Sequence, residues 1–333
     1  MVTKKEEVKN VYTEIAEAFT VEQEALFAKP NVVGVASGHK ITDGVDTGKP
    51  CVVVFVSQKL PPDELRMDDT IDREIAGYET DVIETGEIFA GPDFKSEEEA
   101  SIEEELGIQT LRQRVRPVMG GFSVGHYRVS AGTIATCVYR EPIPGMPRKY
   151  YILSNNHVLA NSNNARIGDP ILQPGRADGG TMPRDIIARL SCYVPIRFKT
   201  PTSTPINYVD AAIAEGPFHL LNREIYWIGY VKRYNYSPRV GQIVEKTGRT
   251  SNFTTGKILG LNATVDVNYG SGRVARFARQ IITSRMSAPG DSGSLVCDTN
   301  EGAVGLLFAG SSRVTVLNII LYVHRCLRIR LHP

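Results

Sequence analysis

Residues 287–296 read SAPGDSGSLV, a run of small and polar residues that leads into an apolar strand. Glycine, proline, aspartate and serine are the ordinary residues of tight turns, so this segment alone is typical of a turn before a strand. A serine hydroxyl becomes a nucleophile only when a base can remove its proton and a third group orients that base. Ser292 is therefore a candidate nucleophile only if such partners occur elsewhere in the chain.

One histidine has a setting that suits a base. A lone histidine is more often structural than catalytic, and the chain contains six: His39, His126, His157, His219, His324 and His332. His157 follows YILSNN, which predicts an apolar strand that ends in three small polar residues. Such a strand end would hold the imidazole rigidly at the edge of a cleft, so we select His157.

An acidic residue between His157 and Ser292 has to orient this base. Asp210 begins the run DAAIA, whose small residues allow a carboxylate to be buried against an imidazole. Asp185, in RDII, is the second candidate, although its neighbour Arg184 offers it another partner. The sequence therefore favours Asp210 and leaves Asp185 as the alternative.

The order His157, Asp210, Ser292, with SNNHV at the histidine and GDSGS at the serine, resembles the trypsin-like (chymotrypsin-fold) serine peptidases. The resemblance covers roughly residues 118–329 and implies a mainly β fold, with a double β-barrel. It also implies that Ser292 attacks the peptide carbonyl, His157 carries the proton and Asp210 orients the imidazole. The backbone N–H groups of Gly290 and Ser292 would bind the oxyanion. No cofactor is implied.

Two features depart from the secreted members of this family. No activation sequence precedes Met119, so Asp291 has to find a partner other than a new N-terminal amine, or remain solvated. The usual disulfides are also not expected. Both features, together with a two-domain layout, resemble an intracellular group related to the plant narrow-leaf protein.

The resemblance also predicts a substrate pocket, counted without gaps from Ser292. It comprises Met286, Phe308, Ala309 and Gly310. No carboxylate falls at these positions, so a buried basic side chain would lack a counter-charge, and medium-sized aliphatic or aromatic side chains are favoured. A shift of one residue would bring Arg285 to the floor and favour acidic side chains instead.

Two other motifs are weaker. Residues 121–125, GFSVG, match the nucleophile elbow of α/β-hydrolases, but that motif needs a helix directly after Ser123, and the following residues are typical of a strand. Residues 241–247, GQIVEKT, resemble a phosphate-binding loop but lack the glycine before the lysine, so we predict no nucleotide site.

Composition limits the partners and the compartment. A net charge of +1 provides no global field that would recruit nucleic acid or an anionic membrane, and the apolar runs are too short to span a bilayer. The five cysteines are widely spaced, and neither they nor the histidines have metal-ligand spacing, so we predict no metal and no disulfide. The N-terminus lacks a signal peptide. These features predict a cytoplasmic protein.

The chain divides into three predicted segments. Residues 1–90 carry an amphipathic helix over 5–28 and three strands, which predict a small α+β domain with a regulatory, substrate-binding or homo-oligomerising role. Residues 91–117 are acidic and then basic, which is typical of a charged linker, with a short helix from Ser96. Residues 118–333 read as the peptidase domain. Its predicted elements include strands at Gly132–Tyr139, Ile225–Val231 and Gly256–Leu259 and a closing helix within Asn318–Ile329.

We therefore expect a serine endopeptidase that acts on protein or peptide substrates. The alternative is a catalytically silent or self-processing binding or scaffold protein on the same fold.

Overall fold

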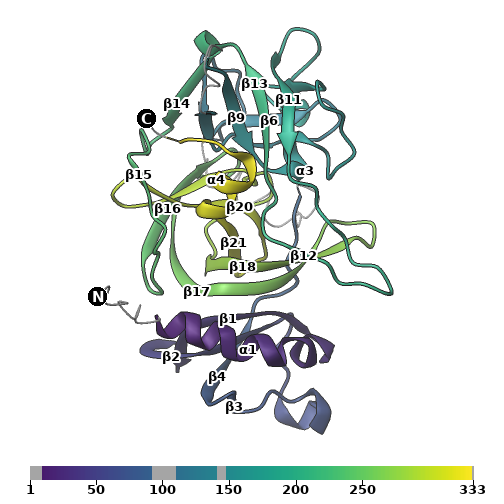
Figure 1. Ribbon diagram of the computed structural model, residues 1–333, viewed down its shortest axis with the longest axis vertical. Helices are drawn as coiled ribbons and strands as arrows, with labels where there is room; N and C mark the ends of the chain where they lie inside the picture. The colour runs from purple at the N-terminus through teal and green to yellow at the C-terminus, as the bar shows by residue number, and fades with distance from the viewer. Residues whose placement is uncertain (1–9, 92–109, 141–147, 332–333) are drawn as a thin grey trace, which may run out of the picture.

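The computed structural model describes residues 10–91, 110–140 and 148–331 of the 333-residue chain (Figure 1). Strands dominate, and they pair into a twelve-stranded, a seven-stranded and a two-stranded sheet. The prediction of a mainly β fold is confirmed. Figure 1 shows the N-terminal segment, in purple, at the lower end of the molecule, below the strands of the C-terminal half.

The seven-stranded sheet forms one half of the peptidase-like region. Its strands are β6 (Ser123–His126), β7 (Gly132–Thr133), β8 (Thr136–Tyr139), β9 (Tyr150–Ser154), β10 (Pro170–Leu172), β11 (Ile186–Tyr193) and β13 (Ala212–Gly216). They lie in the order β7-β6-β10-β11-β13-β9-β8. Since only residues 134–135 separate β7 from β8, the chain itself joins the two edges of the sheet. A buried cluster that includes Val124, Ile152 and Leu190 fills its interior.

The twelve-stranded sheet contains the second half. Its C-terminal strands are β12 (Ile206–Asn207), β15 (Arg233–Tyr234), β16 (Ile243–Gly248), β17 (Asn252–Asn268), β18 (Val274–Ser284), β19 (Leu295–Asp298), β20 (Gly302–Gly310) and β21 (Val314–Ile319). Because β17 pairs with both β16 and β18, six strands close into a ring in the order β16-β17-β18-β21-β20-β19. Val244, Ile258, Ile281 and Leu317 form part of the core inside this ring.

The two halves pack against each other through a shared core. Leu153 and Ile213 of the seven-stranded sheet belong to the same buried cluster as Leu295 and Leu306 of the ring. The last helix, α4 (Ile320–Leu327), lies within the predicted range and adds Val323 to this cluster. A small sheet of β5 (Val118–Gly120) and β14 (Leu221–Ile225) completes the fold. Residues at the facing strand ends of the two halves can therefore meet in one site.

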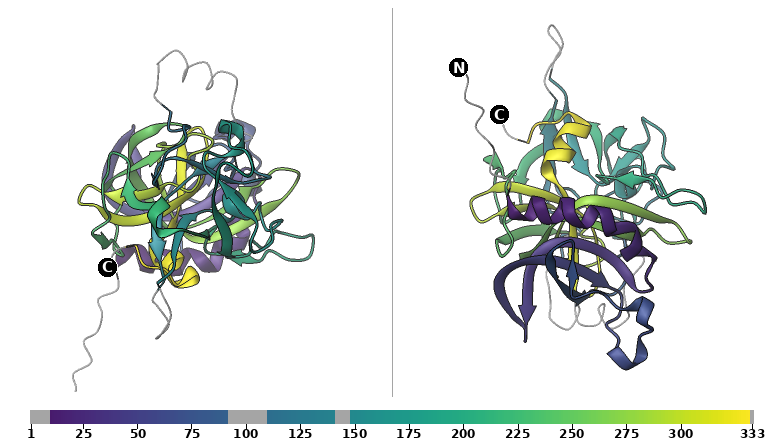
Figure 2. Two further views of the ribbon diagram at one scale, coloured as in Figure 1. Left: turned by 90° about the horizontal axis from the view of Figure 1, so that it is seen from above. Right: turned by 60° about the horizontal axis from the view of Figure 1, so that its bottom comes forward.

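The N-terminal segment extends the same twelve-stranded sheet. It consists of α1 (Val11–Ala28), β1 (Val32–Thr42), β2 (Val45–Val56), β3 (Glu74–Ile75) and β4 (Tyr78–Glu84). The apolar face of α1, with Ile15, Phe19 and Leu26 buried, packs on β1 and β2. Antiparallel pairing of β1 with β17 then carries the sheet from this segment into the ring. The right view of Figure 2 shows the purple N-terminal segment next to the green strands of the C-terminal half.

Three predicted elements differ from the structure. The strand expected at Ile225–Val231 ends at Ile225, and the chain turns there because Trp227 (φ 69°) and Gly229 (φ 90°) adopt left-handed backbone angles that a strand excludes. The strand expected at Gly132–Tyr139 is split into β7 and β8, and Gly256–Leu259 is only part of the long β17. The helix predicted from Ser96 lies outside the described residues.

Three α-helices occur in the described ranges: α1, α4 and the short α3 (Asn156–Leu159). None of them is long and apolar enough to cross a membrane.

Candidate active site

The strand end before His157 is fixed by buried polar side chains. β9 ends at Ser154, and α3 begins at Asn156. Ser154, Asn155 and Asn156 donate to three backbone oxygens at 2.7 Å each, those of Thr133, Asp210 and Val194, respectively. Buried polar groups cost stability unless they are hydrogen-bonded, so these contacts explain why the run SNN precedes the histidine. They fix His157 at the end of the strand.

Asp210 is the carboxylate that the structure brings to this imidazole. His157 Nδ1 lies 2.6 Å from Asp210 Oδ2, and the His157 backbone N–H donates to Asp210 Oδ1 at 3.2 Å. The Tyr269 hydroxyl donates to Asp210 Oδ2 at 2.8 Å. Asn318 of β21 accepts the Asp210 backbone N–H at 2.9 Å, so this aspartate is tied to both halves of the fold.

Ser292 lies on a turn that passes directly beside the end of β9. Gly290 (φ 99°) and Gly293 (φ 100°) take left-handed angles that favour glycine. Thr133 fastens the turn, because its N–H donates to Ser292 O at 2.8 Å and its hydroxyl donates to Gly290 O at 2.9 Å. A Cβ atom on Gly293 would lie 2.1 Å from Ser154 Oγ, so only glycine lets the serine turn approach the histidine strand this closely.

Several polar groups around this turn have no partner in the described part of the chain. His157 Nε2 is buried and makes no hydrogen bond, so none joins it to the Ser292 hydroxyl in this structure. The backbone N–H groups of Gly290 and Ser292 also donate to no acceptor among the described residues. Unpaired buried polar groups are uncommon in folded proteins. This arrangement leaves a base and two donors available to a bound molecule.

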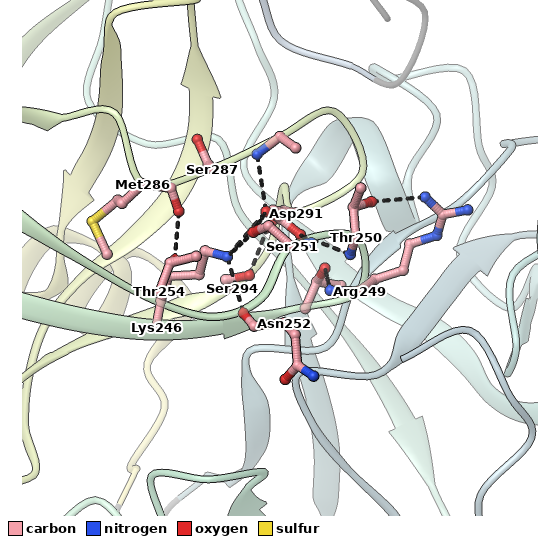
Figure 3. A network of polar contacts seen from close by, with 12 residues as sticks. Lys246, Arg249, Thr250, Ser251, Asn252, Thr254, Met286, Ser287, Asp291 and Ser294 are labelled. Atoms are coloured by element: carbon pink, nitrogen blue, oxygen red, sulfur yellow. Dashed lines mark hydrogen bonds and ion pairs between the residues drawn. The ribbon is translucent and has the colours of Figure 1, made fainter. Parts of the chain in front are cut away.

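Asp291 is held by an internal cation (Figure 3). The Lys246 ammonium lies 3.0 Å from Asp291 Oδ2, and both side chains are fully buried. The Ser251 hydroxyl donates to the same oxygen, and the backbone N–H groups of Thr250 and Ala288 donate to the carboxylate at 2.8 and 3.0 Å. Asp291 therefore has a partner other than an N-terminal amine, and it is not solvated.

These contacts keep Asp291 ionised. Burial on its own would raise the pKa of this carboxyl, but Lys246, Ser251 and the backbone donors outweigh burial and hold the pKa below its ordinary value of 3.8. Burial also lowers the pKa of Lys246, against the attraction of Asp291. The stabilisation from a lowered carboxyl pKa is complete above pH 3.8 and is lost only as the pH falls through the folded-state pKa. The turn that carries Ser292 is thus anchored throughout the neutral range.

We expect Lys246→Met to lower the free energy of unfolding by about 3–5 kcal/mol at pH 7, because it would leave a buried carboxylate without its cation. Urea unfolding followed by circular dichroism measures this loss. The matched control is Lys232→Met, which removes an exposed lysine that pairs with Glu301 and should change stability little. Equal effects of the two substitutions would contradict the role given to Lys246.

The two alternatives from the sequence lie elsewhere. Ser123 on β6 is fully buried, donates to Asp178 and accepts the Gly175 N–H at 2.9 Å, and a turn and β7 follow it instead of a helix. GFSVG is therefore not a nucleophile elbow. The Asp185 carboxylate bonds to Arg184, and to Arg114 at 3.1 Å, and it does not contact His157.

Sequence comparison supports the resemblance. No protein-family model matches the chain. Over 110 residues the chain is 36% identical to Serine protease 2 of Streptomyces fradiae, an alignment that covers 32% of this chain and 51% of that protein. Over the aligned residues the chain is therefore similar to a serine protease. It spans about half the length of the curated relative that it matches.

Three bacterial proteases are among the solved structures whose backbones superpose on part of this chain. Thermobifida fusca protease A has a TM-score of 0.44 at 14% identity and covers 65% of this chain and 98% of its own. The Nocardiopsis protease has a TM-score of 0.45 at 18% identity, covering 65% and 99%. The Cellulomonas bogoriensis chymotrypsin has a TM-score of 0.43 at 17% identity, covering 64% and 97%.

The apolar side chains of the predicted substrate pocket belong to two different buried clusters. Met286 is buried inside the ring, in the cluster of Val244 and Ile258, whereas Phe308 and Ala309 belong to the cluster between the ring and the N-terminal segment. The side chain beside Gly310 is Ser287, whose Oγ would lie 3.4 Å from a Cβ atom on that glycine. Arg285 is exposed.

Phe89, which follows the strands of the N-terminal segment, pairs with Gly310 as an isolated β-bridge. The Phe89 N–H donates to Gly310 O at 2.9 Å, and the Gly310 N–H donates to Phe89 O at 3.0 Å. On the other side, Asn268 at the end of β17 exchanges hydrogen bonds with Ile88 O and the Ala90 N–H at 2.9 and 3.0 Å. Residues 88–90 therefore lie between β17 and the end of β20, beside the predicted pocket wall.

Lys246 is a residue of this site that the sequence reasoning missed, since its motif was compared only with phosphate-binding loops. The available signal was the alternation along β16, where Lys246 shares a buried face with Val244 and Gly248. A lysine on an inward face requires an acidic partner. In the described ranges, no three His, Cys, Asp or Glu side chains are placed to hold a metal ion.

Proposed function

We propose that this protein is a serine endopeptidase in which His157, Asp210 and Ser292 act together. The observation that carries the proposal is the buried His157–Asp210 pair, whose Nε2 atom makes no hydrogen bond and which follows the strand end that the glycine-hinged turn of Ser292 packs against. Catalytic hydrogen bonds are often long before substrate binds. The proposal requires the Ser292 hydroxyl to reach Nε2 when substrate binds.

The proposed reaction proceeds through an acyl-enzyme. Ser292 Oγ attacks the peptide carbonyl while His157 Nε2 takes the hydroxyl proton, and Asp210 stabilises the imidazolium. The oxyanion accepts hydrogen bonds from the Gly290 and Ser292 N–H groups, which are unpaired among the described residues. The proton then passes to the leaving amine, and water releases the acyl group by the same steps in reverse.

A peptide library, read by mass spectrometry for new termini, tests this function and its specificity together. We expect cleavage mainly after Leu, Met or Phe, about tenfold or more above cleavage after Lys or Arg in kcat/KM. The Ser287 and Thr315 hydroxyls near Gly310 bond to each other at 2.7 Å, and no carboxylate is among the predicted pocket residues. A buried basic side chain would remain without a counter-charge.

Other cleavage patterns have distinct meanings. Cleavage mainly after Lys or Arg would refute the predicted pocket. Cleavage after Asp or Glu would indicate that Arg285, and not Met286, forms the floor of the pocket. A folded protein that cleaves no member of the library would contradict the peptidase proposal.

The position of residues 88–90 favours a second candidate function, self-processing. These residues already pair with Gly310 in the way that an extended peptide adds a strand to a sheet edge. The chain that follows them, up to Pro117, is the segment that the sequence predicts as a charged linker. We therefore propose that the protein can present this part of its own chain to the Ser292 site.

Self-processing predicts slow cleavage between Phe89 and Pro117 on prolonged incubation. Intact mass spectrometry of the wild type beside Ser292→Ala measures it, and fragments should form only in the wild type. Fragments that appear equally in both proteins would exclude self-processing and point to a contaminating protease.

We also propose a reducing, cytoplasmic location. Its support is that all five cysteines are free thiols, with Cys51, Cys137 and Cys297 buried. A homo-oligomer that forms through the N-terminal segment stays a prediction, which light scattering of the full chain would test.

A further inference from the structure

Tyr269, which belongs to the half of the fold built by the twelve-stranded sheet, contacts the Asp210 carboxylate. It directly follows β17, and its side chain is almost completely buried. Its hydroxyl donates to Asp210 Oδ2 at 2.8 Å, and His157 Nδ1 lies 2.6 Å from the same oxygen. One carboxylate oxygen is thus shared by the imidazole and a tyrosine hydroxyl.

This hydroxyl is a permanent donor. Burial, and then the neighbouring Asp210 charge, raise the pKa of Tyr269 well above its ordinary value of 10, while Arg273 acts weakly in the opposite direction. The phenol therefore keeps its proton throughout the neutral range. The ionisable groups that face it are His157 on α3, Asp210 before β13 and Arg273 in the turn before β18.

Packing fixes the ring of Tyr269 in this position. Phe198 contacts it edge-on, with ring centroids 5.5 Å apart, and Phe277 stacks on it at 6.3 Å. The backbone N–H of Tyr269 donates to Arg273 O at 2.8 Å, which closes the turn after β17. The hydroxyl cannot leave Asp210 without repacking these aromatic rings.

We infer that Tyr269 is a positioning residue, which holds the Asp210 carboxylate in place and limits the negative charge that it presents to His157. This inference rests on the proposed function. A hydrogen bond to a carboxylate spreads its charge. Without the hydroxyl, the charge on Oδ2 would act on the imidazole alone, and His157 would hold its proton more strongly.

The test is Tyr269→Phe, which removes only the hydroxyl. We expect the acid limb of the kcat/KM profile to move to higher pH by about half a unit or more, and kcat to fall about tenfold. The matched control is Tyr234→Phe, which removes the tyrosine hydroxyl that accepts the Leu331 N–H at 2.9 Å. It should leave the pH profile unchanged. A Tyr269→Phe profile that equals the wild type, or an equal shift in the control, would overturn the inference.

A second readout does not depend on catalysis. Titration of His157 by NMR on histidine-labelled protein, assigned with His157→Ala, should show the same upward shift in Tyr269→Phe. If the wild type cleaves nothing while this shift is present, the proposed peptidase function fails and the role of Tyr269 stands.

If Tyr269→Phe does not fold, an NMR measurement on the wild type tests the inference instead. The Tyr269 hydroxyl proton and the His157 Nδ1 proton should then show a nuclear Overhauser effect, because both protons point at Oδ2. A visible Nδ1 proton without this effect would refute the inference.

Discussion

Ser292→Ala should lower kcat for peptide cleavage by about 10⁶-fold while the protein remains folded. The hydroxyl makes no hydrogen bond with a described residue, so its loss removes the proposed nucleophile without removing a structural contact. The contacts that hold the turn, from Thr133 to the Gly290 carbonyl and from Lys246 to the Asp291 carboxylate, are unaffected. Steady-state kinetics on a peptide from the library, together with the melting temperature, measure both parts of this expectation.

Ser123→Ala is the matched control. Its hydroxyl bonds to Asp178 and Gly175 in the core, so its removal should cost about 1–3 kcal/mol of stability and leave kcat nearly unchanged. If Ser292→Ala keeps more than about a hundredth of the wild-type rate, a level that the loss of a nucleophile does not permit, Ser292 is not the nucleophile.

Asp210→Asn should lower kcat by about 10⁴-fold with little loss of stability. An asparagine amide can replace the carboxylate sterically, but it would hold the His157 ring in the wrong tautomer and could not stabilise its cation. The measurement is kcat of Asp210→Asn and of the wild type at saturating substrate. The His157 backbone N–H would still have the amide oxygen to donate to, and the Tyr269 hydroxyl can accept a hydrogen bond from the amide NH2, which favours a folded variant.

Asp185→Asn separates this role from a structural one. Arg184, more than any other partner, holds the pKa of Asp185 well below its ordinary value, and Thr181 also donates to this carboxylate. The substitution should therefore affect stability and leave turnover almost intact. The reverse ranking of the two asparagine variants would give the orienting role to Asp185.

Local motifs were enough to select the three candidate residues, since each has a distinctive neighbourhood in the sequence. The SNN run predicted a rigid strand end before His157, and the small residues after Asp210 predicted a buried carboxylate. Both features are present in the structure. The contacts that support these residues were not predicted, because Lys246–Asp291 and Tyr269–Asp210 join strands whose register is a tertiary property.

The same distinction holds for the fold. The apolar stripe of α1 predicted its buried face correctly, because helical periodicity is local. The pairing of β1 with β17 continues the N-terminal sheet into the ring. It could not be predicted, because the sequence of neither strand alone indicates its partner. The domain limits near residues 90 and 117 and the relation to the plant narrow-leaf group stay predictions.

The most direct test of the central claim is to treat the purified protein with a fluorophosphonate and locate the adduct by peptide mass mapping. The reagent phosphonylates a serine oxygen only where a base and an oxyanion site activate it. We predict a single adduct on the peptide that contains Ser292, and none in His157→Ala. An adduct on Ser123, or a folded wild type that takes up no reagent, would contradict the account.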